Sequence, residues 1–250
     1  MTSRGIVPTR QKRTRRKDNS LLTREFVLKP VSMKDVTERY RRWLMDDEIV
    51  RYLEVALTDR SMPALRAYVR KAIDDPNRYF FVIQSLKTQE SIGTISLKVN
   101  RLHETGSYGL LIGERGYWGT NAALQAQVAL FDFAFGALGL RKLTGGVCRD
   151  NIKVHFNLRR LGFVREGVQR AQVRMGKDGR EVSDVVLYGM LAEEWAARTS
   201  KFDHLRVSSS DDGIDNAISG RMAREAVREN SARENSASVR LSDEQMGKQT

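Results

Sequence analysis

The sequence contains one cysteine, Cys148, so no disulfide can form within the chain, and a reducing cytoplasm fits this composition. No apolar run approaches the roughly 18–20 residues that a membrane-spanning helix needs. The basic N-terminal stretch is not followed by the apolar segment of a secretory signal. We therefore expect a cytoplasmic protein that has no membrane partner.

Metal-binding residues are also scarce. The three histidines and the single cysteine are scattered and lack the close spacing typical of metal ligands, so we predict no metal. Walker-type and dinucleotide-binding glycine motifs are absent. Cys148 and His155 together admit a thiol nucleophile, but a buried structural cysteine at a strand end is the interpretation that we favour.

Charge is unevenly distributed along the chain. The net charge is +12, from 43 Lys and Arg against 31 Asp and Glu, and residues 1–20 carry seven basic residues against one acidic residue. This segment has almost nothing to bury, so we predict a disordered basic arm over 1–20. The arm leaves nucleic acid open as a partner, although no aromatic residue stands between its charges for base stacking.

From residue 200 onward the sequence loses its apolar periodicity. The pentapeptide RENSA occurs at 228–232 and again at 233–237, without an apolar stripe. We predict a disordered polar tail over 200–250. The folded domain is then expected over 21–199, which is long enough to bury a core.

The part between these tails alternates strand and helix patterns. Runs of β-branched and aromatic residues predict strands, and apolar residues at i, i+4 and i+7 predict helices. The expected strands cover 25–31, 79–86, 91–99, 108–112, 142–147, 163–173 and 182–191, and the expected helices cover 32–43, 61–73, 119–138 and 151–161. Short connections favour an antiparallel meander in the middle. This order predicts an α/β (α+β) fold, with a mixed, mostly antiparallel sheet of about seven strands and helices on both faces.

A glycine-containing loop joins the strand at 108–112 to the helix expected from Gly119. Such a loop aims backbone N–H groups and the positive end of a helix at a phosphate, an attraction of about 0.3–1 kcal/mol from the dipole alone. Glycine also lets the backbone approach an anion without a Cβ clash. Arg115 or Thr120 can add a side-chain donor. The alternative is a plain strand-to-helix turn without a ligand.

Several spaced motifs resemble one enzyme superfamily. They are ERGYWGT at 114–120, FDFAF at 131–135, LGLRKL at 138–143, NI at 151–152 and LGFVREG at 161–167. In this order they resemble the GNAT superfamily of N-acetyltransferases, and within it the branch of ribosomal-protein N-terminal acetyltransferases and amino-sugar acetyltransferases. The resemblance covers about residues 24–195. It implies a sheet that splays between its fourth and fifth strands, which are expected here at 108–112 and 142–147.

The resemblance also implies acetyl-CoA as co-substrate and direct transfer of the acetyl group to a primary amine, without an acyl-enzyme. In such proteins the pantetheine arm pairs with the fourth strand, the following loop holds the pyrophosphate, and an asparagine opening the next helix contacts the CoA arm. On this sequence the strand residues are Leu110, Leu111 and Ile112, the loop residues are Arg115, Gly116, Trp118, Gly119, Thr120, Asn121 and Ala122, and the asparagine is Asn151. A backbone N–H near Leu111 is then placed to stabilise the oxyanion.

Three positions depart from the family pattern. Asn121 stands where the loop usually has a second small residue, although asparagine tolerates unusual backbone angles better than most residues. Leu158 stands where many members carry a tyrosine that protonates the departing thiolate. Ser107 stands where the fourth strand often carries a glutamate. These departures leave open a non-catalytic module that binds CoA or nucleic acid.

A primary ammonium must lose a proton before it attacks, and a carboxylate or a histidine can accept that proton directly or through water. Glu104 and His103, just before the strand at 108–112, are candidates for this base, with an exposed hairpin position as the alternative for each. Tyr108 is a further catalytic candidate, with a core aromatic residue as its alternative. Glu114, beside the cofactor loop, is another position with a carboxylate.

The identity of the amine has two options. Residues 184–195 resemble the ending of amino-sugar and other small-molecule members, whereas the basic arm suits a ribosome-associated enzyme that acetylates protein N-termini. We favour the small molecule, and a nucleotide-linked amino sugar would also match the positive charge of the core. A homodimer is left open.

Overall fold

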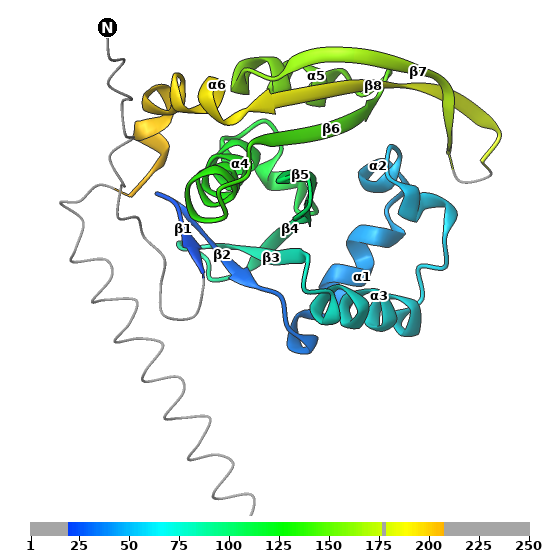
Figure 1. Ribbon diagram of the computed structural model, residues 1–250. Helices are drawn as coiled ribbons and strands as arrows, with labels where there is room; N and C mark the ends of the chain where they lie inside the picture. The colour runs from blue at the N-terminus through cyan, green and yellow to red at the C-terminus, as the bar shows by residue number, and fades with distance from the viewer. Residues whose placement is uncertain (1–19, 177–178, 208–250) are drawn as a thin grey trace, which may run out of the picture. The chain divides into compact units, whose positions relative to one another are not determined.

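The computed structural model describes residues 20–176 and 179–207 of the chain. The arm predicted over 1–20 and the tail predicted from residue 200 lie outside the described residues, except for Ser20 and residues 200–207. One sheet runs through the described part, and helices pack against it (Figure 1). No described helix is long and apolar enough to cross a membrane.

The sheet has eight strands in the spatial order β1-β2-β3-β4-β5-β6-β8-β7. Their bounds are β1 Leu21–Leu22, β2 Phe26–Pro30, β3 Arg78–Ser85, β4 Ser91–Asn100, β5 Thr105–Ile112, β6 Lys142–Cys148, β7 Val164–Met175 and β8 Glu181–Leu191. Neighbouring strands are antiparallel, except that β5 and β6 are parallel. The mixed, mostly antiparallel sheet and its meander β3-β4-β5 are therefore confirmed. The strand that the sequence did not predict is β1, a two-residue edge strand.

Helices cover both faces of this sheet, as predicted. Their bounds are α1 Glu38–Met45, α2 Asp47–Val50, α3 Met62–Asp74, α4 Ala122–Phe131, α5 Ile152–Leu161 and α6 Ala192–Ala196, with short 3-10 helices at Met33–Asp35, Glu54–Leu57, Arg115–Tyr117 and Thr199–Leu205. Adjacent strand residues point to opposite faces, and the buried side chains divide accordingly. Phe81 on β3 belongs to the cluster of α4 and α5, whereas its neighbour Phe80 belongs to that of α1 and α3.

The starts of the first two long helices follow their capping residues. The helix expected from Ser32 begins instead at Glu38, where the Thr37 side chain caps it. Ser32 is used elsewhere, because its N–H donates to the Asp35 carboxylate at 2.7 Å and closes a separate 3-10 helix. The helix expected from Ser61 is confirmed as α3, which this serine caps.

The helix predicted over 119–138 is shorter and less regular than expected. Gly119 has φ +75°, outside the right-handed helical region, so α4 begins only at Ala122. Beyond α4 the chain continues as a π-helix over Asp132–Ala137. The sequence predicted one continuous helix because the apolar composition continues from the loop before Ala122 through the π-helical segment after Phe131.

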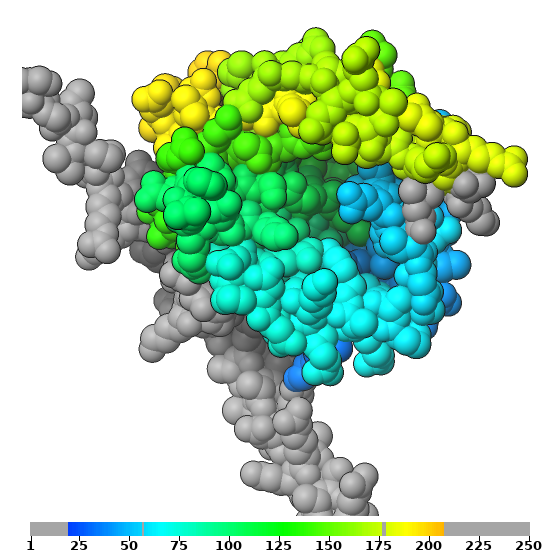
Figure 2. Space-filling model, turned by 45° about the vertical axis from the view of Figure 1, so that its right-hand side comes forward, coloured from blue at the N-terminus to red at the C-terminus, as the bar shows by residue number. Residues whose placement is uncertain are grey.

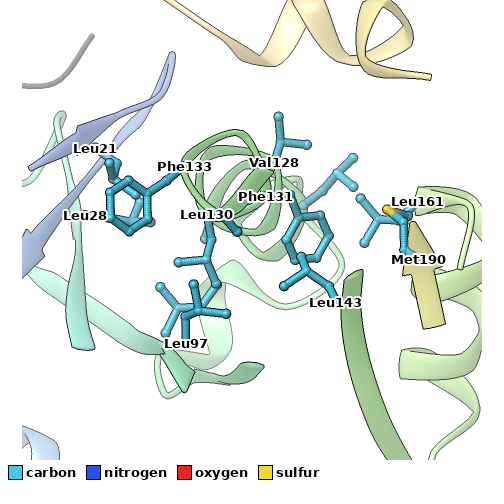
Figure 3. Close-up of a cluster of buried hydrophobic side chains, with 14 of the residues drawn as sticks. Leu21, Leu28, Leu97, Val128, Leu130, Phe131, Phe133, Leu143, Leu161 and Met190 are labelled. Atoms are coloured by element: carbon cyan, nitrogen blue, oxygen red, sulfur yellow. The ribbon is translucent and has the colours of Figure 1, made fainter. Parts of the chain in front are cut away.

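Helix α4 is the centre of the larger hydrophobic core (Figure 3). Its Leu130 and Phe131 are fully buried, and the Phe131 ring centroid lies 5.1–5.5 Å from those of Tyr108, Phe163 and Trp195. Side chains are buried around most of the circumference of this helix. Such a helix has no polar face, so its sequence lacks the periodicity that marks an amphipathic helix.

The fold continues beyond the predicted end of the domain at residue 199. The 3-10 helix Thr199–Leu205 buries Phe202 and Leu205, and the Phe202 ring stacks on Trp195 with centroids 5.5 Å apart. The predicted tail therefore begins too early. Only two apolar side chains, within an otherwise polar stretch, hold this segment against the core. Two residues are too few to form a recognisable helical period.

Strands β5 and β6 pair only where both begin. Thr105–Ser107 lie beside Lys142–Thr144, whereas β5 runs on to Ile112 and β6 runs on to Cys148. The two strands diverge beyond Ser107, which confirms the splay between the fourth and fifth predicted strands. On this side, the edge of β5 over 108–112 therefore has no strand beside it.

Candidate active site

The carboxyl ends of β5 and β6 frame the candidate site. Because the two strands are parallel, the segments that follow them emerge on the same side, and α4 and α5 begin there. Ligands of α/β sheets bind outside the carboxyl ends of diverging parallel strands, where helix N-termini carry partial positive charge. The loop 113–121 and the turn 149–151 are therefore the candidate cofactor-binding segments.

The backbone of the loop 113–121 bends at Gly119, whose φ of +75° is a conformation that glycine adopts without strain. Asn121 has φ −80° and ψ 5°, so this position does not require a small residue, and its side chain does not cap α4. The Thr120 hydroxyl donates to Tyr117 O at 2.7 Å and accepts from Ala122 N at 3.2 Å. Within the described part of the chain, the N–H groups of Gly119 and Asn121 bond no protein acceptor and are available to an anion.

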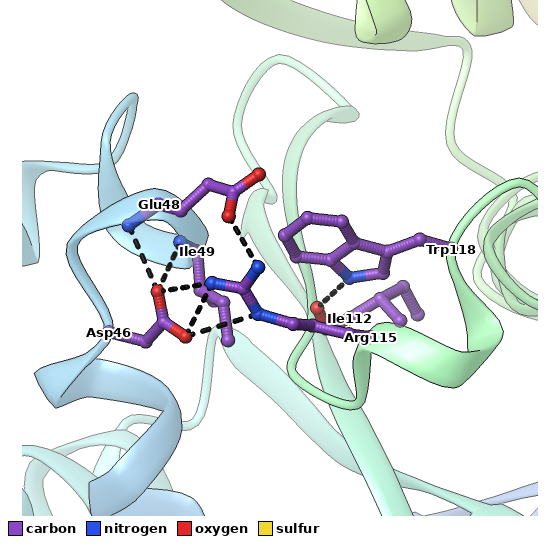
Figure 4. Close-up of polar contacts among 6 residues, drawn as sticks. All are labelled: Asp46, Glu48, Ile49, Ile112, Arg115 and Trp118. Carbon is purple, nitrogen blue, oxygen red and sulfur yellow. Dashed lines mark hydrogen bonds and ion pairs between the residues drawn. The ribbon is translucent and has the colours of Figure 1, made fainter.

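Arg115 lies against α2 (Figure 4). Its Nε and one Nη donate to the two Asp46 carboxylate oxygens at 3.3 and 3.0 Å, and the guanidinium also contacts the Glu48 carboxylate. The hydrogen bonds from Arg115 hold the pKa of Asp46 below its ordinary value. Exposed ion pairs of this kind are weak. To make the predicted contact with phosphate, Arg115 must therefore break an ion pair with Asp46 or Glu48.

Two cations lie near the Trp118 indole ring. Its Nε1 donates to the Ile112 carbonyl at 2.9 Å (Figure 4), while Arg115 and Lys153 lie 5.3 and 5.4 Å from its ring centroid. Lys153 belongs to the first turn of α5, so this contact joins the segments that follow the two diverging strands. The sequence motifs did not indicate Lys153, because an exposed lysine in the first turn of a helix carries no signal of its own.

Asn151 caps α5, because its side-chain oxygen accepts from Val154 N at 3.4 Å. The oxygen is therefore used by the helix, and the side-chain NH2 group and the backbone are what this residue can offer to a CoA arm. The structure brings Asn151 to the same end of the diverging strands as the loop 115–122. The predicted cofactor residues thus lie on two segments at one edge of the sheet, and their contacts with CoA stay a prediction.

The His155 ring does not bond the Cys148 thiol, whose sulfur lies 3.9 Å from the Tyr52 carbonyl oxygen. His155 Nδ1 lies 2.8 Å from the Tyr188 hydroxyl, and His155 Nε2 lies 3.1 Å from the Cys148 carbonyl oxygen. Burial raises the pKa of the Cys148 thiol, which lowers its reactivity. Cys148 ends β6 as the favoured interpretation expects, but it is only partly buried. Among the residues described, no group of three or more His, Cys, Asp and Glu side chains could hold a metal ion.

Tyr108 is the first residue of β5 beyond its pairing with β6. Its ring packs on Phe131 and Phe163, with centroids 5.1 and 6.0 Å away, and its hydroxyl accepts a hydrogen bond from Gln127 at 2.9 Å. Burial raises the pKa of the Tyr108 hydroxyl, so this group stays protonated near neutral pH. Tyr108 is both a core aromatic residue and a hydrogen-bonding group at the start of the splay.

The candidate bases lie away from that point. Glu104 and His103 are exposed in the turn before β5. Glu104 is four residues from Tyr108, roughly 13 Å at the rise of a strand, so it precedes the paired residues Thr105–Ser107 and does not stand in the diverging part of β5. Glu114 accepts a hydrogen bond from Trp43 Nε1 at 3.0 Å and faces α1. The geometry gives the prediction of Glu104 as general base no support.

A polar groove lies on the other face of the sheet. Ser107 precedes Tyr108 in β5 and therefore points to the opposite face. The groove is lined by Asn77, Lys98, Ser107 and Thr144, among others. On the side of the molecule that carries α1 and α3, Figure 2 shows a hollow between these helices in blue and cyan and the strands in green. The start of the splay is thus bordered by a core helix on one face and by polar side chains on the other.

Residues 25–164 match the family model described as an acetyltransferase (GNAT) domain. The chain belongs to the GNAT acetyltransferase family. The match runs from before β2 to the first residue of β7, so it includes the diverging strands, the loop and both helices that frame the candidate site. The resemblance read from the sequence motifs is confirmed at the level of the GNAT family, while the branch stays a prediction.

Individual relatives agree with this assignment. A Bacillus licheniformis protein named uncharacterized N-acetyltransferase p20 is 26% identical over 184 residues, which are 71% of this chain and 98% of that protein. A structure from T. thermophilus described as an acetyltransferase is 28% identical, with a TM-score of 0.62, and the match covers 74% of this chain and 95% of that one. The predicted N-acetyltransferase enzyme class and fold are confirmed.

A more distant structure shows the same fold with a bound cofactor. The spermidine N-acetyltransferase of Vibrio cholerae, solved with CoA and spermine, is 20% identical with a TM-score of 0.61, and the match covers 69% of this chain and 98% of that one. At this identity the likeness extends to the fold. CoA binding is thus a property of a fold neighbour, which agrees with acetyl-CoA as the predicted co-substrate.

Proposed function

We propose that this GNAT enzyme moves an acetyl group from acetyl-CoA directly to the primary amine of a small molecule such as an amino sugar. The observation that carries the proposal is the divergence of β5 and β6 beyond Ser107, between a loop with available N–H groups and a polar groove. A thioester held between the strands and an amine held in the groove would meet at this divergence. Direct transfer requires this proximity of the two reactants.

The donor side of the proposal uses groups that stand around the loop. The N–H groups of Gly119 and Asn121 and the N-terminus of α4 suit the pyrophosphate of CoA. Lys153, from the facing helix, adds a cation. The pantetheine arm would then lie along the open edge of β5 over 108–112, with a backbone N–H of this edge directed at the oxyanion.

The acceptor side uses the groove. Asn77, Ser107 and Thr144 offer an amide and two hydroxyls, which suit the hydroxyl groups of a sugar. Lys98 lines the same groove and suits an anionic group such as the phosphate of a nucleotide-linked amino sugar. The described lining contains no carboxylate. In the proposed reaction, the proton of the attacking amine therefore passes to water and not to a positioned Asp or Glu.

Thermal unfolding of the full chain with and without acetyl-CoA tests the donor site. A ligand at about 100 times its Kd adds roughly 2.7 kcal/mol to the free energy of unfolding, so a clear rise in Tm is expected. The full chain is needed, because a boundary at residue 200 would remove the buried Phe202 and Leu205. A folded sample without any shift would contradict CoA binding.

Release of free CoA thiol then identifies the acceptor class. Amino sugars and nucleotide-linked amino sugars are compared with peptides bearing free N-termini, and turnover with the sugars is expected. Turnover with peptides alone would replace the small molecule by a protein N-terminus, which is the function that the basic arm favours. CoA binding without turnover of any amine would favour the non-catalytic module.

A further inference from the structure

Three polar side chains form a hydrogen-bonded row where β5, α4 and α5 meet. Gln127 Nε2 donates to the Tyr108 hydroxyl at 2.9 Å, and Asn157 Nδ2 donates to Gln127 Oε1. Gln127 is only 2% exposed, within the apolar surroundings of α4. Apolar side chains of the same shape can replace a buried hydrogen-bonded pair at little cost, which leaves a role in function open for this row.

The row sets the direction of the Tyr108 proton. Because Gln127 Oε1 accepts a hydrogen bond from the Asn157 amide, the NH2 group of Gln127 faces Tyr108. The Tyr108 oxygen is the acceptor in that bond, so its own O–H points elsewhere. In the part of the chain that the structure describes, this O–H meets no bonded acceptor. A donor is thus held in a defined direction at the start of the splay.

The position of Tyr108 matches the thiol end of the proposed cofactor path. Tyr108 directly follows the last residue of β5 that pairs with β6. The next residue of β6 is Gly145, where a Cβ would lie 3.9 Å from Cε1 of Tyr108, so the ring borders a position without a side chain. A CoA arm that enters at Ile112 and follows the edge of β5 inward would bring its sulfur to this narrow end.

Resting on the proposed function, we propose that the Tyr108 hydroxyl donates a hydrogen bond to the CoA sulfur, and that Gln127 and Asn157 are positioning residues that hold it there. In the transfer, the amine nitrogen forms a bond to the carbonyl carbon, the C–S bond breaks, and its electron pair stays on sulfur. The nitrogen loses its proton to water. The hydrogen bond from Tyr108 stabilises the thiolate, which then takes a proton from solvent.

Tyr108 acts here as a hydrogen-bond donor, and the transferred proton comes from solvent. An ordinary thiol has a pKa of about 8.5 and an ordinary phenol about 10, and burial raises the pKa of Tyr108 further. Complete proton transfer from the phenol to the thiolate is therefore unfavourable, whereas a hydrogen bond to the charged sulfur is strong. The donor also supplies an interaction that Leu158 cannot make, since that side chain is apolar and 1% exposed.

The test is the pKa of the CoA thiol bound to the full chain. It is read from the ultraviolet absorbance of the thiolate, as the difference between the complexes with CoA and with desulfo-CoA. Tyr108→Phe keeps the ring contacts and is expected to raise the bound thiol pKa by about one to two units, a 10- to 100-fold loss of ionisation. Tyr188→Phe removes a hydroxyl bonded to His155 and is the matched control, for which no change is expected.

The positioning role has its own readout. Gln127→Met removes the amide with little change of shape and is expected to raise the bound thiol pKa less than Tyr108→Phe does. Because Gln127 acts through Tyr108, the double variant should show no more than the Tyr108→Phe shift. Additive shifts, or an unchanged thiol pKa in Tyr108→Phe that still binds CoA, would overturn the inference. Failure of the unaltered chain to bind CoA in calorimetry would overturn the proposed function, and this inference with it.

Discussion

Replacing Gly113 with alanine tests how α1 is packed against the start of the cofactor loop. A Cβ built on Gly113 would lie 2.1 Å from Cδ2 and 2.2 Å from Cγ of Trp43. The Trp43 ring is 5% exposed, and its Nε1 donates to Glu114. The ring therefore cannot move aside without losing core contacts and this hydrogen bond, and the substitution overpacks a filled space.

The expected size of the effect follows from two opposing terms. Gly113 does not have a positive φ, so alanine fits its backbone and gains about 0.4–1 kcal/mol from the reduced entropy of the unfolded chain. Overpacking of a core costs about 1–3 kcal/mol. We expect a net loss of about 1–2 kcal/mol in the free energy of unfolding, or roughly 2–8 °C in Tm for a domain of this size.

Urea unfolding followed by circular dichroism measures this loss, and Gly116 supplies the control. Gly116 lies in the same loop, has no atom within 4 Å of an added Cβ and lacks a positive φ, so Gly116→Ala should be neutral or slightly stabilising. In a Trp43→Ala background, Gly113→Ala should also cost nothing. If Gly113→Ala is as stable as Gly116→Ala, or costs the same with and without Trp43, the packing argument is wrong.

Three further outcomes are expected. Asp46→Asn keeps a side chain that can cap α2 but removes the ion pair with Arg115. Because Arg115 lowers the pKa of Asp46, urea titrations should show a small loss of stability at neutral pH that disappears as pH falls through the lowered folded-state pKa. Truncation after residue 199 removes the buried Phe202 and Leu205 and should cost about 3–6 kcal/mol in the same assay, whereas truncation after residue 207 should cost little. Gly119→Ala forces a side chain into a left-handed conformation and should weaken CoA binding about 5- to 30-fold in calorimetry, so equal affinities would contradict the loop as binding site.

Local patterns were enough for most of the elements. The seven expected strands correspond to β2 through β8, because alternating apolar residues bounded by turns encode a strand within a few positions. Ser61 marked the start of α3 correctly for the same kind of local reason, a cap followed by proline. At Ser32 the prediction was wrong because the same capping pattern can begin an α-helix or a 3-10 helix, and here it begins a 3-10 helix. Around Phe202 it was wrong because the short segment has no periodic pattern that could mark it.

The candidate site was predicted only in part. The motifs grouped three features into one candidate site, namely the loop, the β5 edge and Asn151. They could do so because their order along the chain follows the order of strand, loop and helix in the fold. Lys153 was missed, because an exposed lysine in the first turn of a helix carries no signal of its own. Glu104 was proposed from its nearness to β5 in sequence, and it stands just before the paired residues Thr105–Ser107, so its role as a base stays a prediction.

The sequence by itself therefore determined most of the strands and helices, the GNAT family and the position of the candidate cofactor loop along the chain. Only the tertiary structure decided the partners of the polar side chains. Arg115 pairs with Asp46, 69 residues away in the chain. Gln127 bonds Tyr108, 19 residues before it, and Asn157, 30 residues after it. Local periodicity reports which face of an element is buried, whereas a hydrogen bond depends on where two distant elements bring their donor and acceptor atoms. That placement is set by the packing of the whole sheet and its helices.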